Sequence, residues 1–381
     1  MKKTLAAVAV LGAFAGSALA ADVQLYGIVD TGVGYTHTDA DGLLDNGVDQ
    51  SKDSFSMKSG QASGSRWGIK GTEDLGNGVT VGFILEDGFD SDDGTEDSTG
   101  IMFNRESSLF VEGGFGKFAM GRIGSINNGQ SSWAKVGMIS AFGTSDWGGY
   151  SANVGNTMSL AGQWDNMIAY QTPDFAGFKV YAQYGMGTNN HENESSSDRY
   201  YALGATYNNG PLAGYFAIDS INYESVVNKD VDDSLTVTLG GSYDFEVVKV
   251  YLGGQYFDEV KASSLKGVTD DFADWNDKTD KVKGYALTLS ADAPVAGGKA
   301  MFGVGYFDAE QADSVKDNLG EKYDFSRFVV SVGYDYPFSK RTDIYAVASY
   351  MQDSIEDKTD AKEFDSDPSA YAVYVGLRHR F

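Results

Sequence analysis

Cysteine is absent from this chain of 381 residues, and the 5 prolines and 3 histidines are almost as scarce. A chain without cysteine forms no disulfides, even when it is secreted. The scarcity of histidine bears on catalysis, because hydrolytic sites need a base and its orienting partner within reach of a nucleophile or a water molecule. No serine motif accompanies the histidines, so the sequence predicts that the protein is not an enzyme and needs no cofactor.

A helical membrane span and an excess of positive charge are also missing. The apolar run at residues 5–14 follows Lys2 and Lys3 and is shorter than the roughly 20 residues that a spanning helix requires. Together with the small residues that follow, it predicts a signal peptide over residues 1–20, cleaved after Ala20. The formal charge of −25 becomes −27 without the two lysines, which argues against nucleic acid as a partner.

Glycine and aromatic residues are abundant. The chain holds 48 Gly, 22 Phe and 23 Tyr, a composition that favours strands and tight turns over helices. A mean hydropathy of −0.29 excludes a helical membrane protein, but it agrees with a transmembrane barrel whose inner face is wet. The composition is even from residue 21 to residue 381, so we expect one domain without a linker.

Short alternating segments recur along the chain, separated in turn by short and long connectors. The short ones are rich in Gly, Asn, Asp and Pro and lie at 74–78, 113–116, 173–177, 208–214, 244–248, 293–298 and 336–341. The long ones are polar and mostly acidic and lie at 37–60, 87–103, 123–162, 187–198, 222–233, 258–281, 309–324 and 352–369. These connectors join sixteen antiparallel strands, with short periplasmic turns at one rim and long extracellular loops at the other.

The C-terminal segment "YAVYVGLRHRF" shows why the sheet should be a closed barrel. Tyr371, Val373, Val375, Leu377 and His379 alternate with more polar residues and end on Phe381. No tail follows to cover this apolar face, so lipid would have to cover it. Closure of the sheet leaves no unpaired strand edge in hydrocarbon. We therefore predict a transmembrane β-barrel in the outer membrane, with Phe381 at the periplasmic aromatic girdle.

From "DVQLYGIVDTGVGY" onward, the chain resembles the general porins of Gram-negative bacteria, especially the neisserial and β-proteobacterial branch. The stretches that carry the resemblance are "SRWGIKGTEDLGNGVTVGFILE", "FNRESSLFVEGGFGKFAMGR", "DNMIAYQTPDFAGFKVYAQYG" and "VGLRHRF". The resemblance implies a homotrimer of sixteen-stranded, water-filled channels that pass small hydrophilic solutes and ions. It also implies that assembly machinery reads the last strand (Leu377, His379 and Phe381), and that the third long loop folds inward to form a constriction.

The sequence of that third loop, residues 123–162, supports inward folding. It is the longest connector, and a loop of such length without structure of its own is usually functional. Asp146 is its one carboxylate, and its aromatic residues Trp133, Phe142, Trp147 and Tyr150 would be poorly placed in solvent. We call this segment the constriction loop.

The resemblance also implies an electric field across the constriction, between basic residues on the wall and carboxylates on the loop. Such a field orders water and favours polar solutes. Arg66 and Arg105 match the basic ladder of the family, and alternation places Lys70 on the lumen side with Arg66. The residues that we predict at the constriction are Asp30, Arg66, Lys70, Glu86, Arg105, Asp146 and Gln163.

Two departures from the family weaken the basic side of this field. Ile28 and Gln163 stand where many general porins carry a basic residue, and Asp30 and Glu86 add negative charge. We therefore expect a weak cation preference. Lys117 also points inward, but it lies close to a periplasmic turn, so its effect on the constriction should be small.

The alternation around Arg105 is irregular. Arg105 shares its face with Leu109 and Val111, whereas Ser108 and Phe110 alternate on the other face. This pattern suggests that one face of the strand is buried against another subunit. Arg122 falls on the outward face, so we expect Arg122, Ser108 and Phe110 to make trimer or loop contacts.

Two alternatives stay open. Trp133, Trp147 and Trp164 leave room for a solute-specific porin with an aromatic-lined constriction. The acidic stretch "DSDDGTED" lacks the helices and the closing glutamate of an EF-hand, so a dedicated metal site is not expected. Divalent cations that bridge the acidic loops to lipopolysaccharide are the remaining way in which ions would bind.

Overall fold

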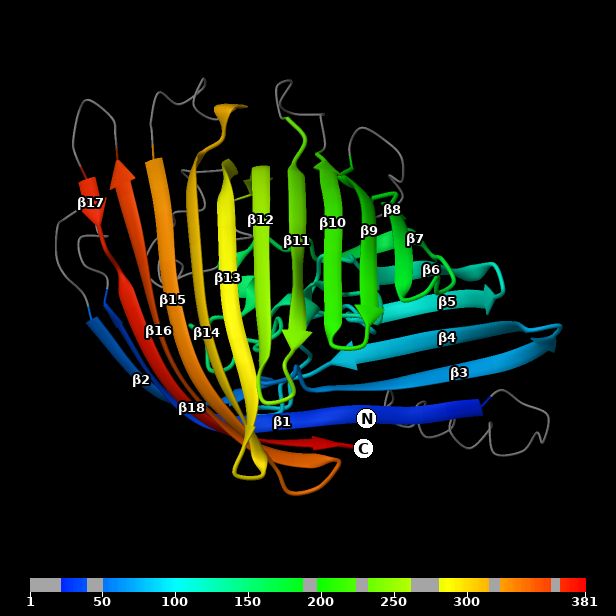
Figure 1. Ribbon diagram of the computed structural model, residues 1–381, viewed down its shortest axis with the longest axis horizontal. Coiled ribbons are helices and arrows are strands. Elements are labelled where there is room, and N and C mark those ends of the chain that lie inside the picture. The colour runs from blue at the N-terminus through cyan, green and yellow to red at the C-terminus, as the bar shows by residue number, and fades with distance from the viewer. Residues whose placement is uncertain are drawn as a thin grey trace.

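The computed structural model describes residues 22–39, 51–187, 197–223, 232–261, 281–314, 323–357 and 364–381. These residues form one antiparallel sheet that curls round and closes on itself (Figure 1). Signal-peptide residues 1–20 lie outside the described residues. None of the helices in these ranges is both long enough and apolar enough to cross a membrane.

The first strands are β1 (Asp22–Asp39), β2 (Ser51–Ser59), β3 (Arg66–Gly76), β4 (Val79–Gly88), β5 (Glu106–Gly113) and β6 (Gly116–Gly124). The next are β7 (Gln163–Gln171), β8 (Phe178–Gly185), β9 (Arg199–Asn209), β10 (Leu212–Asn222), β11 (Leu235–Asp244) and β12 (Lys249–Lys261). The last are β13 (Lys281–Val295), β14 (Gly298–Gln311), β15 (Tyr323–Pro337), β16 (Thr342–Asp357), β17 (Phe364–Ser366) and β18 (Ser369–Arg380). Two short helical turns, η1 (Val136–Ile139) and α2 (Val154–Thr157), lie between β6 and β7.

These eighteen segments make sixteen strands around the barrel. β2 and β3 both pair with β1, at its extracellular and periplasmic halves respectively, so they are two halves of one strand. β17 and β18 pair with β16 in the same way. The barrel closes where β1 pairs with β18. The predicted fold is therefore confirmed, although residues 51–59 form a strand where the sequence predicted a long loop over 37–60.

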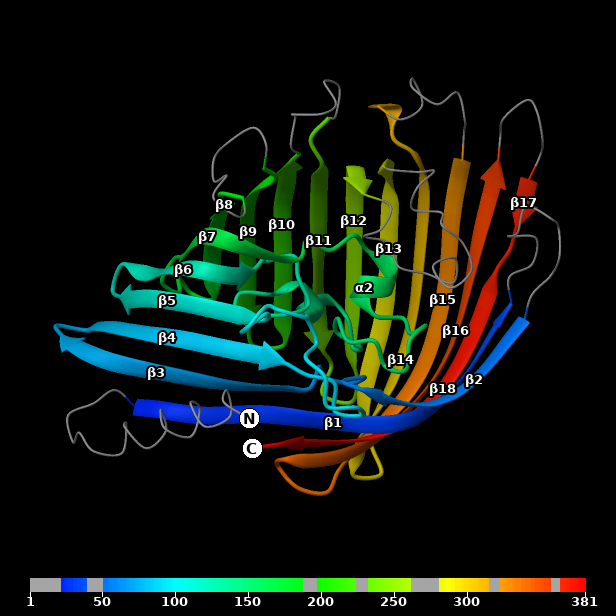
Figure 2. The same cartoon turned by 180° about the vertical axis from the view of Figure 1, so that it is seen from behind.

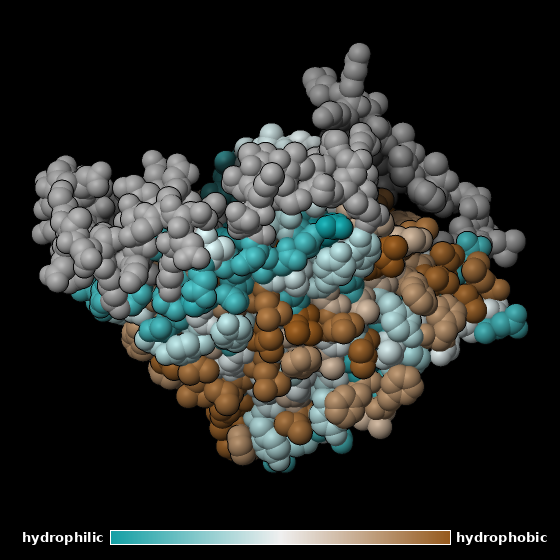
Figure 3. Space-filling view, turned by 90° about the horizontal axis from the view of Figure 1, so that it is seen from above, coloured by the Kyte–Doolittle hydropathy of each residue, from teal (hydrophilic) through white to brown (hydrophobic). Residues whose placement is uncertain are grey.

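Side chains alternate between the two faces of the wall as the sequence predicted. Along β18, Tyr371, Val373, Val375 and Leu377 are exposed on the outside, whereas Tyr374 and Arg378 are buried inside. Figure 3 shows hydrophobic residues gathered on the outer surface, bordered by a hydrophilic strip. The outer face is therefore suited to hydrocarbon and the inner face to water.

Phe381 lies over the seam where the barrel closes. Its backbone N–H donates to the Gly27 carbonyl at 3.1 Å, and its carbonyl accepts from the Gly27 N–H at 3.2 Å. A Cβ at position 27 would lie 2.4 Å from the Phe381 ring, so only glycine leaves room for the ring there. The terminal aromatic residue thus covers the outside of the seam.

The constriction loop folds into the barrel as predicted, although its first two residues, Ile123 and Gly124, belong to β6. Figure 2 shows α2 in front of β12–β14, and α2 contacts β13 and β14. The loop and the inner wall share a hydrophobic core, to which the loop contributes Trp133, Val136, Ile139, Val154 and Met158. The wall contributes Tyr181, Tyr215, Phe257 and Phe307.

Candidate channel constriction

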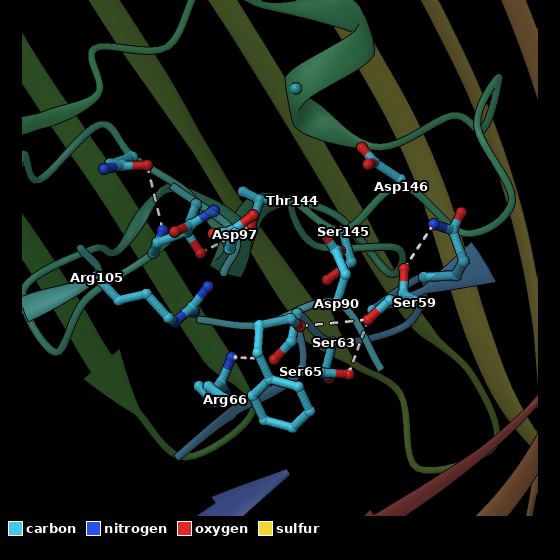
Figure 4. Close-up of a pocket in the computed structure, with 18 of the residues that line it drawn as sticks. Ser59, Ser63, Ser65, Arg66, Asp90, Asp97, Arg105, Thr144, Ser145 and Asp146 are labelled. Atoms are coloured by element: carbon cyan, nitrogen blue, oxygen red, sulfur yellow. Dashed lines mark hydrogen bonds between the residues drawn. The ribbon is translucent and has the colours of Figure 1, made fainter. Parts of the chain in front are cut away.

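A cavity of about 640 Å³ opens between the constriction loop and the barrel wall. Three segments line it: residues 59–66 around the break between β2 and β3, the loop after β4 through Phe89, Asp90 and Asp97, and the constriction loop. Figure 4 shows Arg66 and Arg105 on one side of this cavity and Asp146 on the opposite side. The cavity therefore brings together three of the seven residues predicted for the constriction.

Glu86 joins the two arginines behind the cavity. Arg105 Nε donates to Glu86 Oε1 at 2.8 Å, and Arg66 Nε lies 3.7 Å from Glu86 Oε2. Tyr26 donates its hydroxyl to the same carboxylate at 3.0 Å. One carboxylate thus contacts two guanidinium groups. The Arg66 side chain is 23% exposed and the Arg105 side chain only 6%, so Arg66 is the more accessible of the two to solutes.

Three carboxylates line the cavity, and they come from two loops. Asp146 belongs to the constriction loop, and Asp90 and Asp97 belong to the loop after β4. Burial raises the pKa of the Asp90 carboxyl, and the nearby Asp97 and Asp92 raise it further. With Arg66 and Arg105 across the cavity from Asp146, the cavity can hold a transverse field.

Polar side chains of the inner wall hold the constriction loop in place. Gln183 on β8 accepts from the Ile126 N–H at 2.7 Å, and Gln255 on β12 bonds both the N–H and the carbonyl of Ser159. Ser290 and Ser331, on β13 and β15, accept from the N–H groups of Ala141 and Ala152. Because these contacts come from strands β8 to β15, the loop is fixed along most of its length.

Arg327 on β15 attaches the loop through a buried ion pair. It forms a two-point salt bridge with Asp353 on β16, at 2.5 and 2.9 Å, and donates to the Asn156 carbonyl in α2 at 3.0 Å. Its guanidinium also lies 4.9 Å from the Phe307 ring. The pair is almost completely buried, so its charge acts on the loop and not on the solute.

The break between β2 and β3 supplies a second inward element, residues 60–65. The carboxylate of Asp30 accepts from the N–H groups of Ala62 and Ser63 at 2.9 and 2.7 Å, and from the Tyr345 hydroxyl at 2.5 Å. Gln61 reaches the constriction loop, since its side-chain and backbone oxygens accept from the N–H groups of Gly148 and Trp147. The 60–65 segment therefore clamps the loop on either side of Trp147, next to Asp146.

Four predicted constriction residues do not line the cavity. Asp30 points inward but is fully buried under the 60–65 segment, and Glu86 lies behind the arginines. Lys70 lies 5.1 Å from the Tyr26 ring, towards the periplasmic end of β3. Gln163 donates to the side chain of Gln130, which does line the cavity. Of the seven predicted residues, only Arg66, Arg105 and Asp146 line the cavity.

The interpretation of the strand after Arg105 was wrong. Glu106, Ser108 and Phe110 face the barrel interior, where Ser108 and the loop residue Ser132 donate to Glu106. Leu109, 54% exposed, faces outward. Arg105 precedes β5, and Phe103 has a φ of 58°, so the backbone turns there and the alternation of β5 does not extend back to Arg105. Ser108 and Phe110 therefore contact the loop and not another subunit.

Arg122 lies at an irregularity in the pairing of β6 with β7. It donates to the Asn104 carbonyl at 2.7 Å and to Asp165 at 2.6 Å. These partners are the end of the second long loop and the start of β7, so Arg122 ties together two segments that flank the constriction.

The aromatic-lined alternative fails for the two tryptophans of the loop. Trp133 and Trp147 are 3% and 5% exposed, and both pack against the wall. Trp147 donates to the Phe142 carbonyl and meets Tyr345 edge to face, whereas Trp164 stacks on Tyr200. These rings hold the loop in place, and none of the three lines the cavity.

Sequence reasoning missed Gln61, Gln255 and Arg327. Alternation does place Arg327 on the inner face, but its partners Asp353 and Asn156 are far away in the sequence. Glutamine on an inner face carries no signal of its own, because polar residues are expected at every inward position.

A family model described as Gram-negative porin matches residues 6–356. Over the full length of both chains, the protein is 34% identical to an outer membrane porin protein of Bordetella pertussis and 29% identical to the major outer membrane protein P.IB of Neisseria meningitidis. Among solved structures, it is similar to the anion-selective porin from Comamonas acidovorans, with a TM-score of 0.68 and 25% identity. That match covers 95% of this chain and 100% of the other.

Proposed function

Because the chain belongs to the Gram-negative porin family, we propose that the cavity beside the constriction loop is the charge filter of its channel. The protein is an outer-membrane β-barrel and a general porin, so its activity is the passive passage of ions and small hydrophilic solutes. The observation that carries the proposal is the placement of Arg66 and Arg105 across one cavity from Asp146.

The filter acts through the transverse field between these side chains. A solute with a dipole turns to follow the field and gains favourable interactions at both ends, whereas an apolar solute must displace ordered water without compensation. Arg66 carries most of the effect on passing ions, because it is the more exposed arginine and its contact with Glu86 is the longer one.

The reversal potential of single channels in a salt gradient tests the filter. Arg66→Ala should shift the potential towards cations, because a positive side chain that lines the cavity is lost. Lys70→Ala is the matched control, since Lys70 is also a cation of β3 but lies outside the cavity, and its shift should be much smaller. Equal shifts for the two variants would mean that the cavity is not the filter.

The sign of the wild-type selectivity is a separate matter. The comparisons do not support the weak cation preference that the sequence suggested, and one similar structure is named an anion-selective porin. The proposal therefore concerns only the direction in which a substitution shifts the reversal potential.

Liposome swelling with sugars of increasing size tests the general character of the channel, since uptake should fall smoothly with size and should not saturate.

The predicted partners remain proposals. Homotrimer formation rests on the family resemblance alone, because Ser108 and Phe110 face the barrel interior and give no sign of a subunit contact. Cross-linking of the purified protein in mild detergent would test it, with a ladder that stops at three subunits as the expected result. Contact with lipopolysaccharide and recognition of Phe381 by assembly machinery rest on the resemblance in the same way.

A further inference from the structure

Three lysines meet on the inner wall at its periplasmic end, apart from the charge filter. Lys117 directly follows the turn between β5 and β6, and Lys179 is the second residue of β8. The third, Lys135, reaches them from the constriction loop. None of the three lines the cavity that holds Arg66 and Arg105.

Aromatic rings hold two of these ammonium groups close to one another. Lys117 Nζ lies 3.9 Å from the centre of the Phe110 ring and 5.6 Å from that of Trp133. Lys135 Nζ lies 5.9 Å from the centre of the Tyr181 ring, and the Trp133 and Tyr181 rings meet edge to face at 6.5 Å. Lys117 and Tyr181 both pair with Gln171, so their backbones are two strand spacings apart, or about 10 Å.

The positive charge of this group is only partly balanced. Burial and the nearby Lys117 and Lys179 together lower the pKa of Lys135 to about 8, although Glu106 acts in the opposite direction. Two carboxylates balance part of this charge. Glu112 lies directly across from Lys117 on β5, and Glu106 also accepts from the Ser132 N–H at 2.8 Å and from the hydroxyls of Ser108 and Ser132. The three lysines outnumber these two carboxylates. The site therefore holds cations that repel one another.

We propose that Lys117, Lys135 and Lys179 form a binding site for small divalent oxyanions, such as sulfate or phosphate, in the periplasmic vestibule of the channel. The proposal rests on the proposed function, because the site must open to the water of the channel. It adds a local preference for anions to a chain whose overall charge is strongly negative.

An oxyanion suits this group better than a single halide. Lys135 donates two of its N–H bonds to the carbonyls of Ser132 and Ala134, at 2.7 and 3.3 Å, which leaves one N–H for a ligand. A ligand with several acceptor oxygens and two charges can bridge ammonium groups that come from β6, β8 and the loop. It also relieves the repulsion between them, so its binding should favour the protonated form of Lys135.

Single-channel recording with sulfate tests the site. Sulfate is the better probe because, unlike phosphate, it keeps its charge while lysine titrates. At constant chloride and ionic strength, wild-type conductance should respond to sulfate in a saturable way. The response should weaken as the pH rises through about 8, because Lys135 then loses its proton.

Four variants separate the site from general charge effects. Lys135→Met should raise the half-saturating sulfate concentration about tenfold, the equivalent of one lost charge-assisted contact. Lys179→Met is a second test in case Lys135→Met fails to fold. Lys135→Arg should keep the response and remove its pH dependence. Lys299→Met is the matched control, because Lys299 begins β14 beside another periplasmic turn and pairs with the inward Asp335, far from this group.

The outcomes distinguish the site from the channel. Normal channels with no saturable sulfate effect would overturn the site and leave the proposed function intact. An unchanged sulfate response in both Lys135→Met and Lys179→Met, or an equal loss in Lys299→Met, would also overturn it. Failure of the wild-type protein to conduct in chloride alone would instead count against the proposed function.

Discussion

Glu86 shows how a single residue sets the balance of the charge filter. It accepts hydrogen bonds from Tyr26 and Arg105 and lies near Arg66, so its one negative charge offsets two positive ones. Glu86→Gln should shift the reversal potential towards anions, opposite to the shift of Arg66→Ala, because the amide oxygen still accepts hydrogen bonds but carries no charge. Glu73→Gln, at an exposed position of the same hairpin, is the control. Shifts of the same sign for Glu86→Gln and Arg66→Ala would contradict this account.

Asp90 should make the filter sensitive to pH. Its pKa is raised by burial and by Asp97, so it takes up a proton at a higher pH than an ordinary aspartate does. As the pH falls, the loss of its negative charge should shift the reversal potential towards anions before carboxylates with ordinary pKa values titrate. Asp90→Asn should remove this early part of the pH profile. Asp93→Asn should not, because hydrogen bonds from Thr95 lower the pKa of Asp93.

At this scale, the sequence predicted which residues carry charge but not which of them meet solutes. Parity and family resemblance placed Arg66, Arg105 and Asp146 inside, and all three line the cavity. The same parity argument placed Asp30 in the lumen, where it is fully buried. Alternation reports only the face of a strand. It cannot show that a later segment, here residues 60–65, will fold over that face.

Among the elements, the constriction loop was the most predictable, because it is long and its aromatic residues would be poorly placed in solvent. The strand β2 was the least predictable. Its sequence "SKDSFSMKS" is polar, and only Phe55 and Met57 mark the outward face. The glycines and serines after it resemble a loop, and residues 60–65 do leave the sheet. A strand interrupted by an inward turn therefore reads as one long connector.

The anchor of α2 gives a prediction about the loop as an element. Arg327→Met or Asp353→Asn alone should destabilise the folded barrel by about 3–5 kcal/mol, because each leaves a buried partner without its counter-charge. The double variant Arg327→Met, Asp353→Asn should lose less than the sum of the two, since no buried charge remains. Urea unfolding in detergent measures the stability, and single-channel noise reports release of the loop.

A more exposed ion pair provides the control for that cycle. Lys283 lies 2.8 Å from Asp313, which is 75% exposed, so breaking this pair should cost less than about 1 kcal/mol. If the Arg327 and Lys283 variants unfold alike, the buried pair does not anchor the loop.

For the whole molecule, closure was predictable from the alternation of the strands and from the connectors. The alternation up to Phe381 required lipid outside, and the connectors gave an even number of strands, so β1 had to meet β18. The path of the constriction loop across the barrel was not predictable in the same way. Its attachments, such as Gln255 with Ser159 and Ser331 with Ala152, join residues about 100 to 180 positions apart that have no common sequence signal.

The net charge of the whole molecule acts over a distance that is set by the salt concentration. The Debye length falls from about 10 Å at 0.1 M salt to about 3 Å at 1 M, so the acidic extracellular segments should influence permeating ions only at low salt. The charge filter lies within contact distance of the ions and should act at both concentrations.

The segment 270–280, which is outside the described residues, can separate the two effects. Neutralising it should shift the reversal potential towards anions at low salt and leave it unchanged at high salt, whereas the Arg66→Ala shift should persist. The five substitutions are Asp→Asn at Asp270, Asp271, Asp274, Asp277 and Asp280. Equal shifts at both salt concentrations would place that segment beside the constriction and remove the distinction between long-range and local charge.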